Sequence, residues 1–181
     1  MRIGLLALLV GVMVLGGSAF AAPATHAAGK AQTTTEHLHQ ETSVFYDYVP
    51  CMEELGAYRI TVIINAVQHS TEKDGTGHFT NTETGRFEAV GVDAILEYDE
   101  ETDQQVPAPP DPPVDPSKPT FTGHYTVHGS FSGTQDDGIE TVTFAVHGTG
   151  SDGSVINFHS VLHVSVEQSV VDKMFEKVRC N

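Results

Sequence analysis

Histidine is the residue type in this chain best suited to chemistry, because ten histidines are present and several recur at strand spacing. Imidazole is a frequent ligand of zinc and copper, and its two ring nitrogens can also contact polar ligands. Half of the histidines lie between residues 121 and 166, where they alternate with apolar residues: His124, His128, His147, His159 and His163. A histidine-lined sheet face is therefore the first feature to consider.

Strand geometry decides which of these histidines can act together. Residues four apart in one strand are separated by about 13 Å, so His124 cannot share an ion with His128. Residues opposite each other on neighbouring strands are only about 5 Å apart. We therefore expect His124, His147 and His159 to be the candidates for a metal ion or a polar ligand. A solvated polar face without an ion is the alternative, because no acidic or cysteine ligand falls in register.

Residues 121–166 have the pattern of three consecutive antiparallel strands. Apolar and polar residues alternate over three runs, 121–132, 139–149 and 155–166. Asp137-Gly138 and Asp152-Gly153 separate these runs and indicate hairpin turns. A register that keeps each apolar set on one face places His124 opposite His147 across a six-residue loop. The same criterion places His147 near Asn157 across a three-residue or bulged turn.

No catalytic motif accompanies the histidines in the sequence, and a His-Asp-Ser arrangement assembled in space is left as an alternative. Serines are plentiful, but none lies in the Gly-x-Ser-x-Gly elbow that exposes a nucleophilic serine. The acidic residues lie mainly in turns and in a proline-rich stretch, where no carboxylate pair is set up for glycoside cleavage. Asp136, Asp137 and Asp152 lack the spaced ligands of a known calcium loop, so we expect turn residues. We assign no catalytic residue and expect no cofactor.

The N-terminus has the features of a secretion signal. Arg2 supplies a positive charge, residues 3–15 are apolar, and Ala19-Phe20-Ala21 fits a small-x-small cleavage site. We expect a signal peptide over residues 1–21 and a secreted protein, extracellular or on the exterior of the cell envelope. A retained anchor is the alternative, although the apolar run is short for a bilayer. The small, polar residues 22–42 indicate a disordered leader.

The composition is that of an acidic globular domain. With 9 basic and 24 acidic residues, the formal net charge is −15, which disfavours nucleic acid and anionic membranes as partners. No later segment is apolar enough to span a membrane, so no membrane association is expected once the signal is removed. Roughly 160 residues then remain, enough for one domain with a core.

Cys51 and Cys180 are the two cysteines of the chain. An even number of cysteines in an exported protein favours pairing, so we predict a disulfide between them. Such a bond would tie the two ends of the fold together. Use of either thiol for metal binding or redox chemistry is the alternative, but neither has a cysteine or histidine at ligand spacing.

Further short strands are predicted on both sides of the central stretch, over 44–49, 58–69, 76–82, 86–98 and 172–180. Thr84-Gly85 is expected to form a turn, and a short helix is the alternative for 172–180. Residues 99–119 hold seven of the nine prolines together with many acids, which predicts a long exposed loop. The pattern predicts one all-β domain over 43–181, an antiparallel barrel or a sandwich of seven to eight strands.

Several glycine- and histidine-containing segments resemble a group of uncharacterised, small, secreted bacterial β-proteins: 75–79, 123–129, 147–154 and Phe158-His159. The resemblance covers roughly residues 51–180. It implies a shared fold and export but no activity. The short glycine-rich strands also resemble, in architecture alone, the eight-stranded barrels of the allene-oxide-cyclase and dirigent type.

We therefore expect a secreted, non-enzymatic β-barrel that binds a small molecule at the cell exterior. Aromatic residues are the candidates for its core or for the lining of a ligand cavity: Phe79, Phe121, Tyr125, Phe144 and Phe158. The alternative is an extracellular enzyme, cyclase- or isomerase-like, on the same scaffold. A polar cavity with convergent histidine, Arg59 or tyrosine side chains would favour the enzyme. The sequence predicts no oligomeric state.

Overall fold

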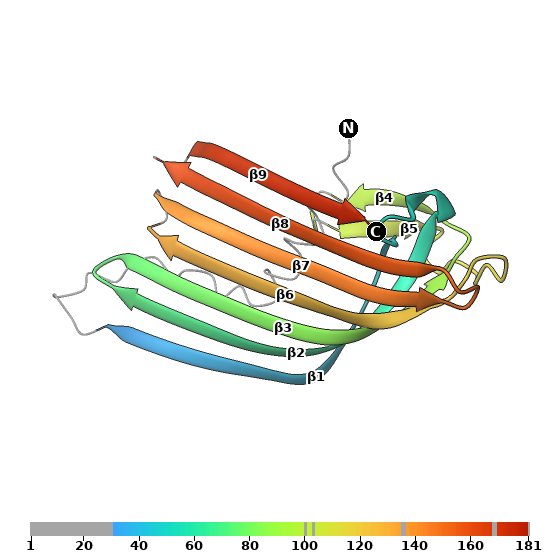
Figure 1. The fold of residues 1–181 in the computed structure, drawn as a ribbon, viewed down its shortest axis with the longest axis horizontal. Helices are drawn as coiled ribbons and strands as arrows, with labels where there is room; N and C mark the ends of the chain where they lie inside the picture. Colours follow the sequence, from blue (N-terminus) through green and yellow to red (C-terminus); the bar gives the residue numbers. More distant parts are fainter. Residues whose placement is uncertain (1–30, 100, 103, 135–136, 168–169, 181) are drawn as a thin grey trace.

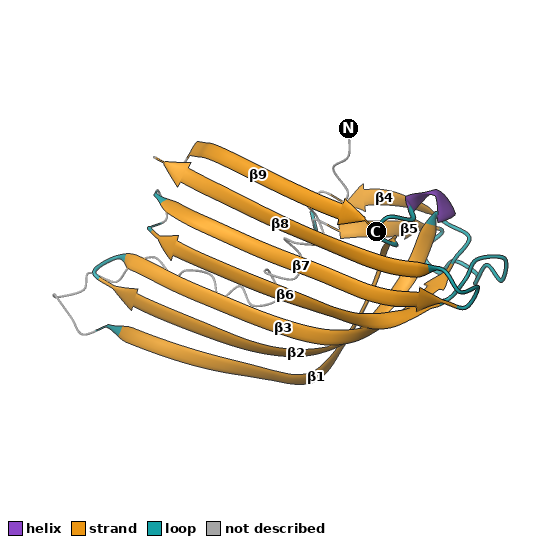
Figure 2. Cartoon of the chain, in the orientation of Figure 1, coloured by secondary structure: helices purple, strands orange, loops and turns teal. Residues whose placement is uncertain are grey.

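The computed structural model describes residues 31–99, 101–102, 104–134, 137–167 and 170–180, without the side chains of 166, 170–176, 178 and 180. This part of the chain is almost entirely β-structure (Figure 2), with one short 3-10 helix, η1 (Glu53–Leu55). Its strands are β1 (Gln32–Tyr48), β2 (Ala57–Lys73), β3 (Thr76–Gly91), β4 (Ile95–Asp99), β5 (Gln104–Ala108), β6 (Phe121–Gly133), β7 (Gly138–Gly150), β8 (Val155–Glu167) and β9 (Val170–Cys180).

Seven of these strands form one curved antiparallel sheet in the order β1-β2-β3-β6-β7-β8-β9 (Figure 1). The remaining two, β4 and β5, pair only with each other. They belong to the segment that connects β3 to β6. A bridge between Val92 and Val114 holds this segment to the end of the main sheet, together with a hydrogen bond from the Asp115 N–H to the Gly91 carbonyl.

Strand alternation divides the main sheet into two chemically different faces. On β2, buried residues occupy the even positions from Tyr58 to Ala66, and on β6 they occupy odd positions such as Phe121 and Tyr125. The register brings these positions together on the inner, concave face. The outer face carries hydroxyls and imidazoles. The sheet therefore has one side suited to a core and one suited to water.

Both predicted hairpin registers are confirmed. Gly133 pairs with Gly138, and this pairing places His124 directly opposite His147. In the second hairpin His147 lies opposite Asn157, as expected. The Gly150 N–H donates to the Ser154 carbonyl at 2.8 Å, which closes a three-residue turn, and Gly153 within it has φ of 88°. That backbone conformation favours glycine and explains the Asp-Gly sequence.

The predicted closed barrel is not formed, although the predicted all-β class is confirmed. Closure requires every strand to have a hydrogen-bonded neighbour on both sides. In the described part of the chain, β1 and β9 each have one such neighbour and form the two edges of an open sheet. The concave face explains why. Besides its buried apolar residues it also carries the polar side chains of Gln68 and Glu140, which do not suit a fully closed interior.

Several strand boundaries also differ from those predicted from the sequence. β1 begins at Gln32, within residues 22–42 that were expected to be disordered; residues 22–30 lie outside the described part. Its polar residues are ordered by pairing with β2 and by bonds between side chains, such as Thr35 Oγ1 to His69 Nδ1 at 2.9 Å. At Gln40, with φ of 54°, a bulge shifts the β1 register. A composition argument from low hydrophobicity cannot detect such a polar ladder.

Two further expectations were wrong. Thr84-Gly85 is not a turn, because β3 runs without a break from Thr76 to Gly91. Residues 99–119 are not one long loop, because β5 pairs with β4 from Asp99↔Gln104 to Ile95↔Ala108. The last strand is confirmed, since β9 pairs with β8 and no helix forms there. In these segments glycine marks a close approach between strands, and proline lies at or near strand ends. Neither residue type therefore marks turns alone.

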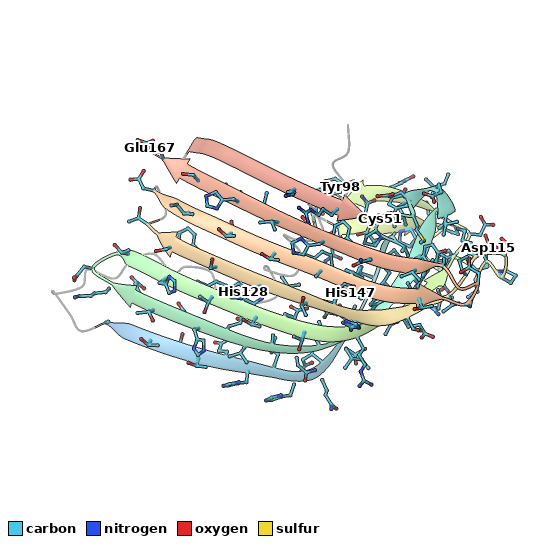
Figure 3. The ribbon with its side chains drawn as sticks, viewed as in Figure 1. Cys51, Tyr98, Asp115, His128, His147 and Glu167 are labelled. Atoms are coloured by element: carbon cyan, nitrogen blue, oxygen red, sulfur yellow. The ribbon has the colours of Figure 1, made fainter. Side chains whose placement is uncertain are left out.

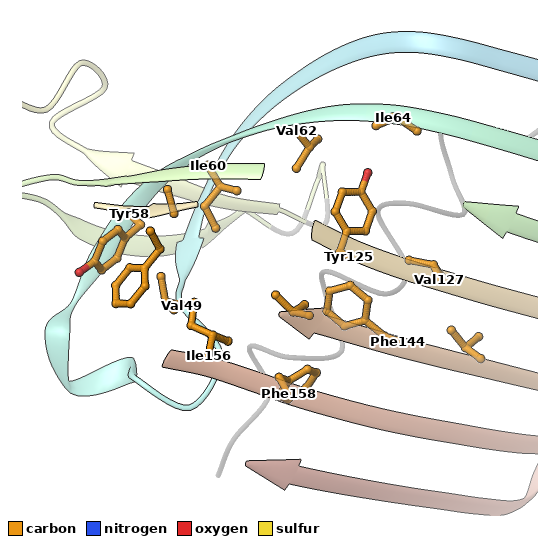
Figure 4. Close-up of a cluster of buried hydrophobic side chains, with 14 of the residues drawn as sticks. Val49, Tyr58, Ile60, Val62, Ile64, Tyr125, Val127, Phe144, Ile156 and Phe158 are labelled. Atoms are coloured by element: carbon orange, nitrogen blue, oxygen red, sulfur yellow. The ribbon is translucent and has the colours of Figure 1, made fainter. Parts of the chain in front are cut away.

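The core lies where β2, β6, β7 and β8 meet the loop after β1 (Figure 4). Its largest fully buried side chains include Tyr58, Phe121 and Phe158. Tyr58 and Phe121 pack edge to face with their ring centroids 5.7 Å apart. Lys118 covers the Tyr58 ring at 5.9 Å and donates to the Val92 carbonyl at 2.7 Å, so it fastens the connecting segment to the core.

Candidate functional site

A cavity of about 490 Å³ lies on the concave face of the main sheet. Its floor is built by the inward side chains of β2, β3, β6 and β7, including Ile60, Val62, Ile64, Val127 and Phe144 (Figure 4). The second half of β1 and residues 48–50 form one wall. Gln104 and Gln105 of β5 border it as well. A volume of this size is in the range of small-molecule sites in proteins.

Aromatic rings form a row that starts on the floor of this cavity and continues into the core. Tyr125 and Phe144 pack edge to face at 6.5 Å, and Phe144 packs in the same way against Phe158 at 5.7 Å. Edge-to-face packing is a favoured geometry for aromatic pairs and restrains the rings. The sequence predicted Tyr125 and Phe144 as core or lining residues, and both line the cavity. Phe121 and Phe158 belong to the core, while Phe79 is only half-buried.

One carboxyl group is buried in this apolar floor. Glu83 is 4% exposed, and the Tyr125 hydroxyl donates to its Oε1 at 2.7 Å. Burial raises the pKa of Glu83, and the hydrogen bond from Tyr125 opposes that shift in part. Burial also raises the pKa of Tyr125, and the neighbouring carboxyl raises it further. The pair is thus a polar point in a surface that is otherwise mostly apolar.

Gly85 sets the position of the Tyr125 ring. It lies opposite Tyr125 in the pairing of β3 with β6. A Cβ atom at Gly85 would collide with the Tyr125 ring and with the Ile63 carbonyl. The absence of a side chain therefore lets the ring lie flat over β3, where its hydroxyl reaches Glu83. The glycine that suggested a turn in the sequence is part of the site.

A second buried carboxyl, that of Asp47, lies at the other end of the cavity. It is 8% exposed and accepts a hydrogen bond from the Tyr48 N–H at 2.7 Å. Burial raises the pKa of Asp47 to about 6, against the smaller opposing effect of that hydrogen bond. Asp47 lies opposite Tyr58 and Glu83 lies opposite Ala66. Since these β2 positions are about 26 Å apart along the strand, the two acids do not form a carboxylate pair.

We predict that Asp47→Asn stabilises the protein at neutral pH and has little effect at about pH 4. The carboxyl ionises near 3.8 when unfolded and near 6 when folded. The folded state therefore holds the proton more tightly, so the stabilisation by Asp47 is complete below pH 3.8 and is lost as the pH rises through 6. A shift of this size corresponds to about 3 kcal/mol at most. Urea unfolding at both pH values measures the difference, and equal stabilities at neutral pH would contradict it.

The histidines of the described strands lie on the convex face, away from the cavity. His128 and His147 mark this face on β6 and β7 (Figure 3). His124 and His147 approach each other, with ring centroids 5.3 Å apart. His159 lies opposite Ala145 and is therefore diagonal to His147. Among the described residues, no three histidine, cysteine or acidic side chains form a group that could hold a metal ion.

Neighbouring threonines partner several other histidines of the convex face. Thr82 Oγ1 lies 3.1 Å from His128 Nδ1, and Thr141 Oγ1 lies 2.9 Å from His163 Nδ1. Such pairs form cross-strand polar contacts like those that commonly stabilise sheets. Ligand binding by His124, His147 and His159 stays a prediction.

Cys51 follows β1 and packs against the core, and it is not a free thiol. Cys180 ends β9 opposite Phe158, which belongs to the same core. The side chain of Cys180 lies outside the described residues, so its pairing with Cys51 stays a prediction. The signal peptide over residues 1–21 also lies outside them.

The sequence reasoning missed both Glu83 and Asp47. Glu83 was hidden by the turn assigned to Thr84-Gly85, although an unbroken strand places it on the same face as Phe87 and Ala89. Asp47 was hidden because the predicted strand 44–49 was too short to show its register. A charged residue in the middle of an apolar strand face was the signal available in both places.

Comparison with known protein families, curated proteins and solved structures finds no match to this chain. Within the described residues, no helix has the length and hydrophobicity needed to cross a membrane.

Proposed function

We propose that this protein is a binding protein that holds a small, mainly apolar molecule against the concave face of its sheet. The supporting observation is the cavity of about 490 Å³, whose floor consists largely of aliphatic and aromatic side chains. Covering such a surface with an apolar molecule removes it from water, at roughly 25 cal/mol for each Å². The fixed aromatic row offers a rigid contact surface that loses little entropy on binding.

The position of the polar residues supports binding rather than catalysis. The enzyme alternative required histidine, Arg59 or tyrosine side chains to converge in a cavity. Arg59 alternates with the inward Tyr58 and Ile60, so it lies on the outer face with the histidines. Three tyrosines of the described chain do line the cavity, Tyr46, Tyr48 and Tyr125. Burial and the neighbouring Glu83 raise the pKa of Tyr125, so its hydroxyl stays protonated at neutral pH and is not available as a base.

The binding site can be tested with Val62→Trp. Val62 lines the cavity, so an indole at this position fills the space that a ligand would occupy. The neutral dye Nile red is expected to bind the wild type with a rise in fluorescence and to bind Val62→Trp at least about tenfold more weakly. Because the chain has no tryptophan of its own, the emission of the new indole also reports an apolar environment.

Ile63→Trp is the matched control. Ile63 is the next residue of β2, but it is 45% exposed and faces the opposite side of the sheet. It should bind Nile red like the wild type and show the red-shifted emission of an exposed indole. Circular dichroism checks that both variants fold. Equal dye binding by two folded variants would refute the proposed site.

We also propose that the protein is exported and that Cys51 and Cys180 are paired. The N-terminal pattern of Arg2, an apolar run and Ala19-Phe20-Ala21 supports export. The contact of Cys51 with the core, and the position of Cys180 opposite the core residue Phe158, support the pairing. N-terminal sequencing of protein recovered from outside the producing cells should begin at Ala22. A chain that begins at Met1 would contradict cleavage.

A further inference from the structure

The charged residues that line the cavity all carry the same sign. Among the described residues, three acidic side chains line it, Glu41, Asp47 and Glu83, and no lysine, arginine or histidine does. The nearest elements explain this distribution. β1 contributes two of the acids and β3 contributes the third, while Arg86 of β3 alternates to the outer face. An anionic occupant would therefore meet like charges with no cation to offset them.

Glu83 is the polar group best placed to orient an occupant. It is 4% exposed and is one of the residues that line the cavity. The Tyr125 hydroxyl donates to its Oε1 at 2.7 Å and so restrains the carboxyl group. Val127 and Ala66 flank Glu83 on the two neighbouring strands, and neither offers a counter-charge. A buried carboxylate in such surroundings lacks a positive partner.

We propose that the occupant is an amphiphilic amine, whose ammonium group pairs with Glu83 while its apolar part lies along the aromatic row. This inference rests on the proposed binding function and specifies the chemical class of the ligand. The ammonium group would donate to the carboxyl oxygen that Tyr125 leaves unused. A charge-assisted hydrogen bond in an apolar setting is stronger than a neutral one, which makes the head group selective.

Carboxylates and alcohols fit the same cavity less well. A fatty carboxylate would place a fourth negative charge among the acids of the lining. A fatty alcohol keeps the apolar contacts but loses the charge on its head group. The net charge of −15 also favours the approach of a cation over that of an anion, although salt screens this effect.

Decylamine, decanol and decanoate separate these cases because they share one apolar chain. Isothermal titration of the full mature protein at neutral pH should give the order amine, alcohol, carboxylate, with the amine at least about tenfold tighter than the alcohol. Glu83→Gln should bring the amine and the alcohol within about threefold of each other while leaving the affinity for decanol nearly unchanged. The glutamine Oε1 can still accept the Tyr125 hydroxyl, so the fold is expected to persist.

Glu88→Gln is the control variant, because Glu88 lies on the same strand, is exposed on the outer face and changes the net charge equally. It should retain the preference for the amine. Decanol binding without that preference would overturn the amine proposal and leave the binding function intact. An unchanged preference in Glu83→Gln would also overturn it. Failure of all three probes to bind, together with equal Nile red binding by the two tryptophan variants, would instead refute the proposed function.

Discussion

Replacing Cys51 and Cys180 together by serine is expected to lower the free energy of unfolding by about 2–5 kcal/mol. The predicted bond closes a loop that contains almost the whole sheet, so it strongly reduces the conformational entropy of the unfolded chain. In the folded state the bond would also link two edge strands of the sheet. Cys51 follows β1 and Cys180 ends β9, and these strands are the two opposite edges of the open sheet. Urea unfolding of the variant and the wild type measures the loss.

The reducing agent dithiothreitol provides the control for the cysteine variant. It should destabilise the wild type to a similar degree and leave the double serine variant unchanged. The mass of the unreduced wild type should be lower than that of the reduced protein by two hydrogen atoms. Alkylation of both cysteines in the folded, unreduced protein would contradict the pairing.

Phe121→Ala is expected to destabilise the protein by about 3–5 kcal/mol, the range seen when a large buried ring is removed. Phe121 is 0% exposed and packs edge to face on Tyr58. Tyr58 in turn carries the Lys118 contact that fastens the connecting segment. The change therefore leaves a hole at the point where the sheet meets that segment. Thermal and urea unfolding, monitored by circular dichroism, measure the effect.

Ile139→Ala is the control for the core variant. Ile139 lies on β7 but is 51% exposed on the outer face, so its replacement should change the free energy of unfolding by less than about 0.5 kcal/mol. If Phe121→Ala had an equally small effect, the main core would not lie where Phe121, Tyr58 and Phe158 meet. The inward and outward faces assigned to β6 would then be wrong.

Local pattern was sufficient to predict the hairpins of this protein. Between residues 121 and 166, each strand has one apolar face, and a slip of one residue would expose that face. This constraint fixed the pairing of His124 with His147 and of Val146 with Phe158. The odd number of residues in the second turn followed from the same constraint. Register was predictable because it depends on residues close together in the chain.

Closure of the sheet was not predictable in this way. Whether β1 meets β9 depends on the curvature of the whole sheet and on how far its concave face is apolar. Neither property belongs to a single hairpin. The binding surface was missed for a related reason. Its polar point joins Glu83 of β3 to Tyr125 of β6, which are 42 residues apart in the chain. Their meeting depends on Gly85, whose role appears only when β3 and β6 lie side by side.

The bulge at Gln40 has a consequence for assembly. An exposed edge strand is a template on which a second chain can add a strand of its own. β1 spans 17 residues, but the bulge breaks its outer edge between His39 and Glu41. A regular strand that bonded in step with one half would be out of step with the other. A single regular strand could therefore pair with only one half of this edge, 32–39 or 41–48, and not with its full length.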